Sequence, residues 1–195
     1  MRLSKYIIII LVFFSISVNA YSQKEENENT KNLKNKIFFG GSFSLQFGSI
    51  TAINIDPVIG IRPIPRLSMG IGGKYQYYNS RSDVFNNYET HIFGGSIFSE
   101  YVIIKDLKNV LPVKVFGGLF THIEYEALSL ESKYFDISNT NIGKDRFWLN
   151  SFLLGGGYNQ KIGNKSYIYI LVLWNVTETI NTPYTNPIYR IGFVF

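Results

Sequence analysis

The sequence contains no cysteine, and this absence excludes two kinds of structure. Disulfides stabilise many small exported domains, but this chain has to be stabilised by packing and hydrogen bonds alone. Anchoring through a lipid-modified cysteine is excluded as well. With only two histidines, His91 and His122, and no thiol, the chain has a poor set of ligands for a metal ion, so no metal or other cofactor is expected.

Clustered positive charge is also missing. The formal net charge is +5 and the sequence pI is about 9.2, but Arg2 and Lys5 lie in an N-terminal segment that we expect to be removed. Without these two residues the charge falls from +5 to +3, and no remaining Lys/Arg cluster is suited to follow a phosphate backbone. Nucleic acid is therefore not an expected partner.

Long apolar runs are absent except near the start. There, "MRLSK" is followed by "YIIIILVFFSISV" and by the small-residue region "NAYSQ", which is the pattern of a secretory signal peptide. The apolar run is shorter than the roughly 20 residues of a spanning helix, so a retained anchor is the weaker alternative. We expect a signal peptide over residues 1–22, cleaved after Ser22 or alternatively after Ala20, and a flexible polar leader over residues 23–35.

From residue 36 onward, apolar residues recur at every second position, which is the period of a β-strand. In "KIFFGGSFSLQFG", apolar side chains hold most odd positions, from Ile37 to Phe47, and small or polar residues hold most even ones. The same alternation predicts seven further strands. The eight expected strands span about 37–47, 51–62, 67–78, 90–104, 113–125, 147–160, 166–176 and 187–195. The facing of strands 147–160 and 166–176 stays open, because apolar residues occupy both of their faces.

These segments predict an all-β fold, an eight-stranded antiparallel up-and-down transmembrane β-barrel over residues 36–195. Each strand has about the 9–11 residues that a tilted strand needs to cross the hydrocarbon layer. A soluble, lipocalin-like barrel with its apolar face inside is the alternative. Glycine and serine decide between the two, because they fall on the polar face, and inside a narrow barrel small residues leave room for long ones. The apolar face is therefore expected to contact lipid.

The polar face carries charges of both signs, which can neutralise one another in a narrow lumen. We expect them to form a structural network rather than a catalytic or ligand site. The predicted members are Asp56, Arg62, Lys74, Glu100, Lys114, His122, Glu124 and Arg190.

The connections between strands alternate in length. Short ones, "RPIPR", "KDLKNVLP" and "GNKS", follow the second, fourth and sixth strands, whereas "NSRSDVFNNYE", "EALSLESKYFDISNTNIGKDR" and "TETINTPYTN" lie on the opposite side. Outer-membrane barrels have short periplasmic turns and longer extracellular loops. The pattern predicts that the long loops face outward, where an unidentified extracellular ligand is a candidate partner.

Several strand and turn motifs are similar to those of a known family. They are "FFGGSFSLQFGSITAINIDPVIGIRPIPRLSMGIGGKYQYY", "HIFGGSIFSEY", "SFLLGGGYNQKIG", "LVLWNV" and "PYTNPIYRIGFVF". Over about residues 37–195 the chain resembles the small eight-stranded outer-membrane β-barrel proteins of Bacteroidetes-type bacteria. The resemblance implies a location in the outer membrane, in contact with its lipids, and implies no catalytic residues.

The segment "YRIGFVF" predicts a further partner. It places Tyr189, Ile191, Phe193 and Phe195 on one side of the last expected strand. Alternating apolar residues that end on an aromatic one resemble the signal by which the outer-membrane barrel assembly machinery engages a final strand, which can be understood as strand addition. We expect these four residues to be that assembly signal.

Two classes of function remain. We favour a structural or surface-binding role of the outer loops, and the alternative is a membrane-embedded enzyme that modifies lipid A by acyl transfer or deacylation. The best catalytic candidates are His122 and Glu124, with Ser96 on the neighbouring strand. However, "THIEYE" lacks the His-x-Ser pattern of the deacylases, because Glu124 stands in the position of the serine. A packed polar network explains the same residues, so no catalytic residue is expected, and His91 is expected at the rim.

Overall fold

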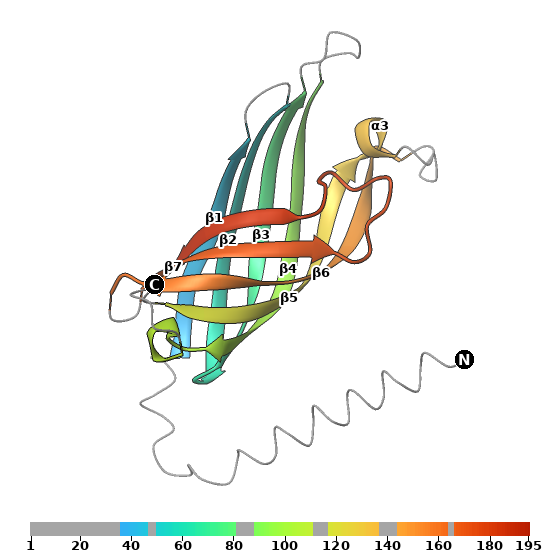
Figure 1. The fold of residues 1–195 in the computed structure, drawn as a ribbon. Coiled ribbons are helices and arrows are strands. Elements are labelled where there is room, and N and C mark those ends of the chain that lie inside the picture. Colours follow the sequence, from blue (N-terminus) through green and yellow to red (C-terminus); the bar gives the residue numbers. More distant parts are fainter. Residues whose placement is uncertain (1–35, 47–49, 81–87, 111–116, 137–143, 164–165) are drawn as a thin grey trace, which may run out of the picture. The chain divides into compact units, whose positions relative to one another are not determined.

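The structure, a computed structural model, describes residues 36–46, 50–80, 88–110, 117–136, 144–163 and 166–195. Residues 37–195 form a closed barrel in which each strand pairs with its sequence neighbours and β8 pairs with β1 (Figure 1). The strands are β1 (Ile37–Gln46), β2 (Ile50–Ile64), β3 (Leu67–Ser80), β4 (Tyr88–Ile104), β5 (Gly118–Glu131), β6 (Arg146–Lys161), β7 (Tyr167–Asn175) and β8 (Ile188–Val194). The predicted all-β, eight-stranded, antiparallel up-and-down barrel is confirmed. The predicted signal peptide and leader lie outside the described residues.

Two short helical elements lie between strands of the barrel, η2 (Leu107–Asn109) between β4 and β5 and α3 (Ser132–Phe135) at the tip of the β5–β6 hairpin (Figure 1). No helix among the described residues is long and apolar enough to cross a membrane. We call the end of the barrel with the two-residue β2–β3 turn at Pro65 and Arg66 the turn end, and the opposite end, with the β7–β8 connection, the loop end.

Most strand boundaries agree with the predictions to within about two residues, but β5 does not. It was expected to end at Tyr125, with a loop from Glu126 onward. Instead β5 continues to Glu131, and its last residues pair with β6 from Glu126↔Ser151 to Glu131↔Arg146. The segment "EALSLE" keeps the two-residue alternation, with Glu126, Leu128 and Leu130 facing inward, and its polar side chains find partners elsewhere in the barrel.

Side chains of even and odd positions face opposite sides of the wall, as the alternation predicted. The structure also resolves the two strands whose facing the sequence left open. In β6, Leu153 is fully buried inside the barrel while Trp148 is exposed outside, and in β7, Leu171 is buried while Trp174 is exposed. Both strands are therefore apolar on both faces, because the interior of the barrel also contains an apolar layer.

That apolar layer fills the lumen toward the turn end. Its members are Phe38, Phe98, Phe120, Leu153, Tyr169, Leu171, Leu173 and Val194. Large rings fit here because glycines lie beside them. A Cβ atom built on Gly70 would lie 2.6 Å from Cζ of Phe98, and one built on Gly157 would lie 2.6 Å from Cζ of Phe120. The expectation that small residues make room for long ones inside the barrel is confirmed.

The pairing of glycine with a larger side chain recurs at every strand interface. In each pair the two residues are directly opposite each other in the ladder, and both face the lumen. The pairs, in order around the barrel, are Phe38–Gly60, Val58–Gly72, Gly70–Phe98, Gly94–Leu128, Phe120–Gly157, Gly155–Leu173, Tyr169–Gly192 and Gly40–Val194. Large side chains that cover neighbouring glycines pin the register of curved sheets, and a one-residue slip would turn each of them to the other face.

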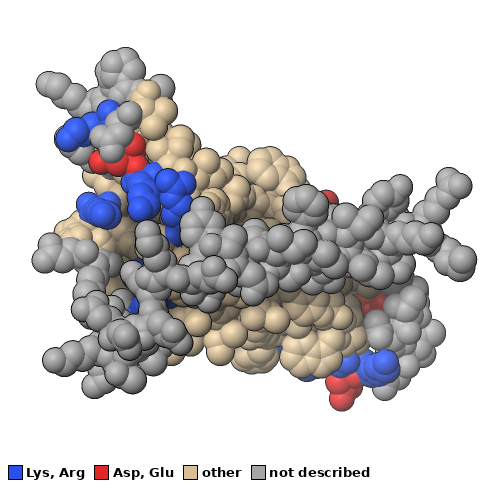
Figure 2. Space-filling view, turned by 90° about the horizontal axis from the view of Figure 1, so that it is seen from below, with Lys and Arg blue, Asp and Glu red and all other residues tan. Residues whose placement is uncertain are grey.

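The outside of the barrel is apolar between its two ends. Exposed side chains include Ile59 and Ile61 of β2, Ile97 of β4 and Ile170 of β7. In the space-filling view, charged side chains gather toward two ends of the described surface, and an uncharged stretch lies between them (Figure 2). The barrel thus has charged and apolar side chains inside, and a predominantly apolar outer face between its two ends.

Candidate functional site: a charged cluster and a cavity in the barrel interior

A group of charged side chains meets inside the lumen beside the apolar layer, and several of its members lie directly opposite apolar ones in the ladder, as in Phe98↔Glu124 and Leu171↔Arg190. We call it the charged cluster, and it consists of Asp56, Lys74, Glu100, His122, Glu124, Glu126 and Arg190. These residues come from β2, β3, β4, β5 and β8. Each is on the inward face of its strand because of the two-residue alternation, and the stagger of neighbouring strands brings them to one level.

Glu124 is at the centre of the cluster. Its side chain is 2 % exposed and contacts three basic groups: Nζ of Lys74 at 2.6 Å from Oε1, Nη1 of Arg190 at 2.7 Å from Oε2, and Nε2 of His122 at 2.9 Å from Oε2. Burying a carboxylate is costly unless it is paired and hydrogen-bonded. Glu124 is therefore held ionised by its neighbours, and they in turn depend on it.

Arg190 and Lys74 link the remaining carboxylates to this centre. Nη2 of Arg190 lies 3.5 Å from Oε2 of Glu126, and its Nε lies 3.8 Å from Oδ2 of Asp56. Nζ of Lys74 lies 2.9 Å from Oε2 of Glu126. Asp56 also accepts a hydrogen bond of 2.9 Å from the hydroxyl of Ser42. Each basic side chain thus contacts at least two carboxylates.

His122 has both ring nitrogens engaged by carboxylates. Nδ1 lies 3.0 Å from Oε1 of Glu100, and Nε2 lies 2.9 Å from Oε2 of Glu124, while the ring stacks on Phe98. Two carboxylates can both accept hydrogen bonds from this ring only when it is protonated on both nitrogens. An imidazolium held in this way has no free nitrogen to accept a proton from a nucleophile. No hydrogen bond joins it to Ser96 within the described structure.

The structure brings together most of the predicted lumen network. Asp56, Lys74, Glu100, His122, Glu124 and Arg190 all belong to the charged cluster, as shown by the ion pairs above. Arg62 does not. It faces the lumen near the turn end, where its guanidinium lies 4.7 Å from the ring centre of Phe38 and 5.6 Å from that of Tyr167. Lys114 lies outside the described residues.

His91 is not in the lumen. Its Nδ1 lies 3.0 Å from the hydroxyl of Tyr75, and its ring stacks with Tyr75 and Phe93, on the outer face of β3 and β4. Its carbonyl oxygen accepts a 2.8 Å hydrogen bond from Arg146, which also donates to the carbonyl of Ser129 at 2.6 Å. Arg146 thus joins β4 to β5 just beyond the last paired residues of their ladder, and His91 is part of this link near the loop end.

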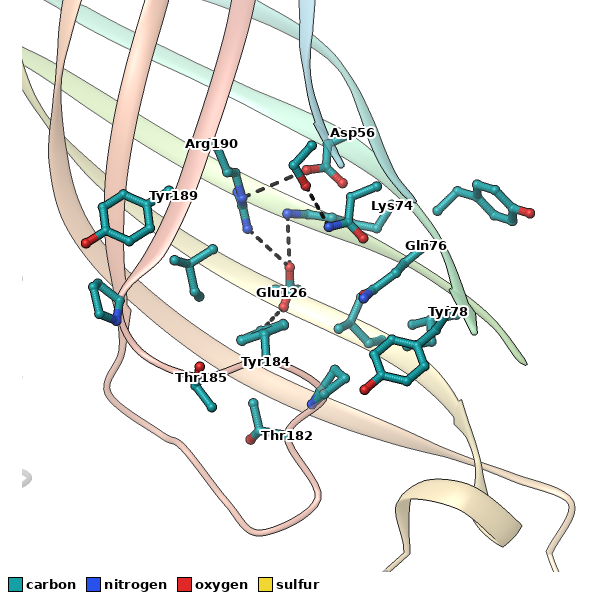
Figure 3. Close-up of a pocket in the computed structure, with 18 residues that line it drawn as sticks. Asp56, Lys74, Gln76, Tyr78, Glu126, Thr182, Tyr184, Thr185, Tyr189 and Arg190 are labelled. Atoms are coloured by element: carbon teal, nitrogen blue, oxygen red, sulfur yellow. Dashed lines mark hydrogen bonds and ion pairs between the residues drawn. The ribbon is translucent and has the colours of Figure 1, made fainter. Parts of the chain in front are cut away.

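A cavity of about 560 Å³ lies on the loop-end side of the charged cluster (Figure 3). Asp56, Lys74, Glu126 and Arg190 form its floor. Its walls include residues from the loop-end parts of β1, β2 and β3 and from the β7–β8 connection. The wall residues that matter below are Ser44, Asn54, Gln76, Tyr78, Tyr184 and Thr185. A void of about 30 Å³ lies among the cluster residues on the turn-end side of this floor, roughly the volume of one water molecule.

Residues 176–187, between β7 and β8, form one wall of the cavity and are tied down by amide side chains. Asn186 Oδ1 accepts a 2.7 Å hydrogen bond from the backbone N–H of Asn175, and Asn186 Nδ2 donates to the carbonyl of Asn175 at 3.0 Å. Asn175 Nδ2 donates to Ser151 on β6. These bonds hold the loop over the barrel mouth and turn its Tyr184 inward (Figure 3).

Tyr184 connects this loop to the charged cluster. Its hydroxyl donates a hydrogen bond to Oε1 of Glu126 (Figure 3). Burial raises the pKa of Tyr184, and the negative charge of Glu126 raises it further, so the phenol stays protonated and remains the donor. The ring of Tyr184 is consequently fixed at the edge of the cavity.

Two residues of the site were missed from the sequence. Glu126 was assigned to a loop because β5 was ended too early, although it continues the even-numbered series of His122 and Glu124. Tyr184 could not be found by alternation at all, because it reaches the lumen from a loop. Among the residues that the structure describes, no group of three or more His, Cys, Asp and Glu side chains is arranged to hold a metal ion.

Comparison with known proteins found no match: no protein-family model matches the chain, and no curated protein is significantly similar to it.

Proposed function

We propose that this protein is an outer-membrane β-barrel, exported by its N-terminal signal peptide, with a structural or surface-binding role at the loop end and no catalytic activity. The observation that carries the proposal is the combination of a closed barrel with an apolar outer face and a charged interior. An exposed apolar patch larger than a few hundred Å² is rare on soluble monomers. Here apolar side chains on the outer faces of all eight strands are exposed.

The height of the apolar surface fits a bilayer. On β4, exposed apolar side chains run from Phe93 to Ile103, ten residue steps, or roughly 33 Å at about 3.3 Å per step. A tilt of about 40° shortens this height to roughly 25 Å, which is about the height of the apolar band of outer-membrane barrels. Charged side chains on the outer face of β4 lie beyond the band, at Glu89 and Lys105.

The geometry of His122 supports a non-catalytic role. A base for a serine nucleophile needs a ring nitrogen that faces the hydroxyl, and both nitrogens of this ring face carboxylates instead. The cluster lies below the cavity and between packed strands, where its members neutralise one another. The resemblance to Bacteroidetes-type barrels implies the same location and supplies no catalytic motif.

A charge placed on the outer face tests the membrane location directly. Ile97 is 58 % exposed and lies near the middle of the apolar band. In a bilayer, Ile97→Lys should reduce the folding free energy by about 2–4 kcal/mol, whereas Glu89→Lys, beyond the band, should change it by at most about 1 kcal/mol. The measurement is equilibrium folding into phosphatidylcholine vesicles.

Cell fractionation is the second test of the membrane location. The mature wild-type chain should be recovered with the outer membrane and should migrate differently on a gel when it is not heated. Recovery in the soluble periplasmic fraction, together with an Ile97→Lys variant as stable as the wild type, would contradict the proposal and favour a soluble barrel.

A further inference from the structure

The cavity above the charged cluster has the properties of a ligand site. Sites for small molecules usually have volumes of roughly 300–1,000 Å³ and combine aromatic walls with a few convergent polar groups. This cavity has a volume of about 560 Å³, two tyrosine rings at its wall, Tyr78 and Tyr184, and amides on two adjacent strands, Asn54 and Gln76. Its volume would accept about one or two hexose rings.

Two of the wall amides have unused hydrogen-bonding capacity. Asn54 donates to the hydroxyl of Ser44 at 2.7 Å, but its Oδ1 is buried and has no hydrogen-bond partner. Because this oxygen has almost no accessible surface, a ligand in the cavity cannot reach it, and Asn54 borders the cavity without offering this acceptor. Gln76 is two residues above Lys74 on β3, and no side-chain hydrogen bond is recorded for it within the described residues. Both residues line the cavity, and Figure 3 shows Gln76 at its edge.

The cavity floor disfavours a charged ligand of either sign. An anion would approach Asp56 and Glu126, and a cation would approach Lys74 and Arg190. None of these charges is free to pair with a ligand, because Lys74 and Arg190 are already held by carboxylates at 2.6–3.8 Å. The cluster also contains four carboxylates against three basic groups, which makes an anion the less favoured of the two.

A neutral, hydroxyl-rich ligand fits the same surface. A hydroxyl group can donate to a carboxylate or to Oε1 of Gln76 and can accept from Lys74, Arg190 or the amide nitrogen of Gln76. The rings of Tyr78 and Tyr184 offer flat apolar faces beside these polar groups. Both are fixed before any ligand arrives, Tyr184 by its hydrogen bond to Glu126 and Tyr78 by an edge contact with Phe135. A preformed site of this kind loses little entropy on binding.

We propose that this cavity binds a neutral saccharide of one or two rings through the amide of Gln76, with the ring faces of Tyr78 and Tyr184 against the sugar. That the sugar comes from outside the cell rests on the proposed function, which directs the loop end outward. The binding site itself does not depend on it.

Calorimetric titration of the purified full chain in zwitterionic detergent micelles tests the proposal. Maltoside and glucoside detergents have to be avoided, because their head groups are themselves saccharides. The probes are maltose, lactose and N-acetylglucosamine, with glucose 6-phosphate and glucosamine as charged counterparts. We expect at least one neutral probe to bind with a Kd of about 10 mM or tighter, and the charged probes to bind at least about tenfold more weakly.

Gln76→Leu should weaken binding of the neutral sugar about tenfold, the usual effect of one lost hydrogen bond. Gln160→Leu is the matched control, since it makes the same change at an exposed position near the turn end and should leave the affinity unaltered. If Gln76→Leu fails to refold, Thr185→Val in the loop wall replaces it, with the same expected direction.

Three results would overturn the proposal: no neutral probe binding, tighter binding of the phosphorylated sugar, or equal affinities for wild type and Gln76→Leu. Because titration in micelles does not depend on where the protein is located in the cell, these results differ from a failed fractionation experiment. A barrel that is soluble but binds the sugar would reject the proposed location alone.

Discussion

Removal of Arg190 is the most direct test of whether the charged cluster stabilises the barrel. Its guanidinium lies 2.7 Å from Glu124, 3.5 Å from Glu126 and 3.8 Å from Asp56, and its side chain is 11 % exposed. With His122 protonated, the cluster holds four carboxylates and three basic groups, a formal charge of −1. Arg190→Met changes this charge to −2 with little change in volume, and leaves Glu124 with two of its three basic partners.

The expected cost follows from that imbalance. Removing one partner of a buried ion pair typically destabilises a protein by about 3–5 kcal/mol, and we expect Arg190→Met to fall in this range. Adding Glu126→Gln returns the cluster to −1, so the double variant should recover about 1–2 kcal/mol of the loss, a coupling usual for residues in one network. Lys133→Met is the control, because its pair with Glu131 is 65 % exposed on the lysine side and should contribute little to stability.

Equilibrium unfolding in urea, with the protein in phosphatidylcholine vesicles, measures these differences. The chain has two tryptophans, Trp148 and Trp174, and both are on the outer face, so their fluorescence should report transfer from water to lipid. A cost below about 1 kcal/mol for Arg190→Met, or a double variant less stable than the single one, would refute the reasoning.

Three further predictions concern other parts of the structure. Gly157→Ala places a Cβ 2.6 Å from the ring of Phe120 and should cost about 1–3 kcal/mol by overpacking, whereas Gly73→Ala, whose Cβ would have only an ordinary contact at 3.6 Å, should cost much less in the same urea titration. Phe195→Ser should slow assembly in pulse-chase measurements while refolding in detergent changes little; equal assembly rates would reject the predicted assembly signal. Tyr184→Phe removes the hydrogen bond from the loop to the cluster and should speed proteolysis of residues 176–187; unchanged cleavage would mean that the amide contacts alone hold the loop.

The predicted assembly signal illustrates what a strand pattern can establish. Tyr189, Ile191, Phe193 and Phe195 all face outward and are 46–66 % exposed, as the alternation predicted. The structure adds that Phe195 exchanges backbone hydrogen bonds with Phe39, at 2.8 and 3.3 Å, at the junction of β8 and β1. Recognition by the assembly machinery stays a prediction, and substitution rather than deletion of Phe195 is the cleaner test because it keeps these two bonds.

The sequence predicted which side chains share a face, but not which share a level of the barrel. Alternation alone places Arg62 and Arg190 together on the inner face. Only the stagger between strands shows that Arg190 reaches Glu124, whereas Arg62 lies near the turn end against Phe38 and Tyr167. The relative level of β5 and β8 is the sum of the registers of the strand pairs between them, and the pattern within one strand carries no signal for register.

The error at β5 has a related cause. "EALSLE" has the composition of a loop, with Glu126, Ser129 and Glu131 within six residues, and was assigned to one. In the structure these polar side chains are satisfied one by one: Glu126 by Lys74 and Tyr184, Ser129 by Arg146, and Glu131 by Thr90 at 2.8 Å. Tertiary contacts thus outweigh local composition. The cavity wall that includes Tyr184 could not be predicted from the sequence for the same reason.

The ring of glycine pairs predicts that the order of the strands along the chain can be changed without changing the barrel. Because every one of the eight interfaces has its own pair, including Gly40–Val194 between the first and last strands, the junction of β8 and β1 is specified in the same way as the other seven. The register of each strand is therefore specified by the pairs that it forms with its two neighbours in the barrel, and not by the order of the strands in the sequence. A circular permutant that joins Phe195 to Ile37 through a short linker and opens the chain between β3 and β4 would retain all eight pairs, and should close into the same barrel.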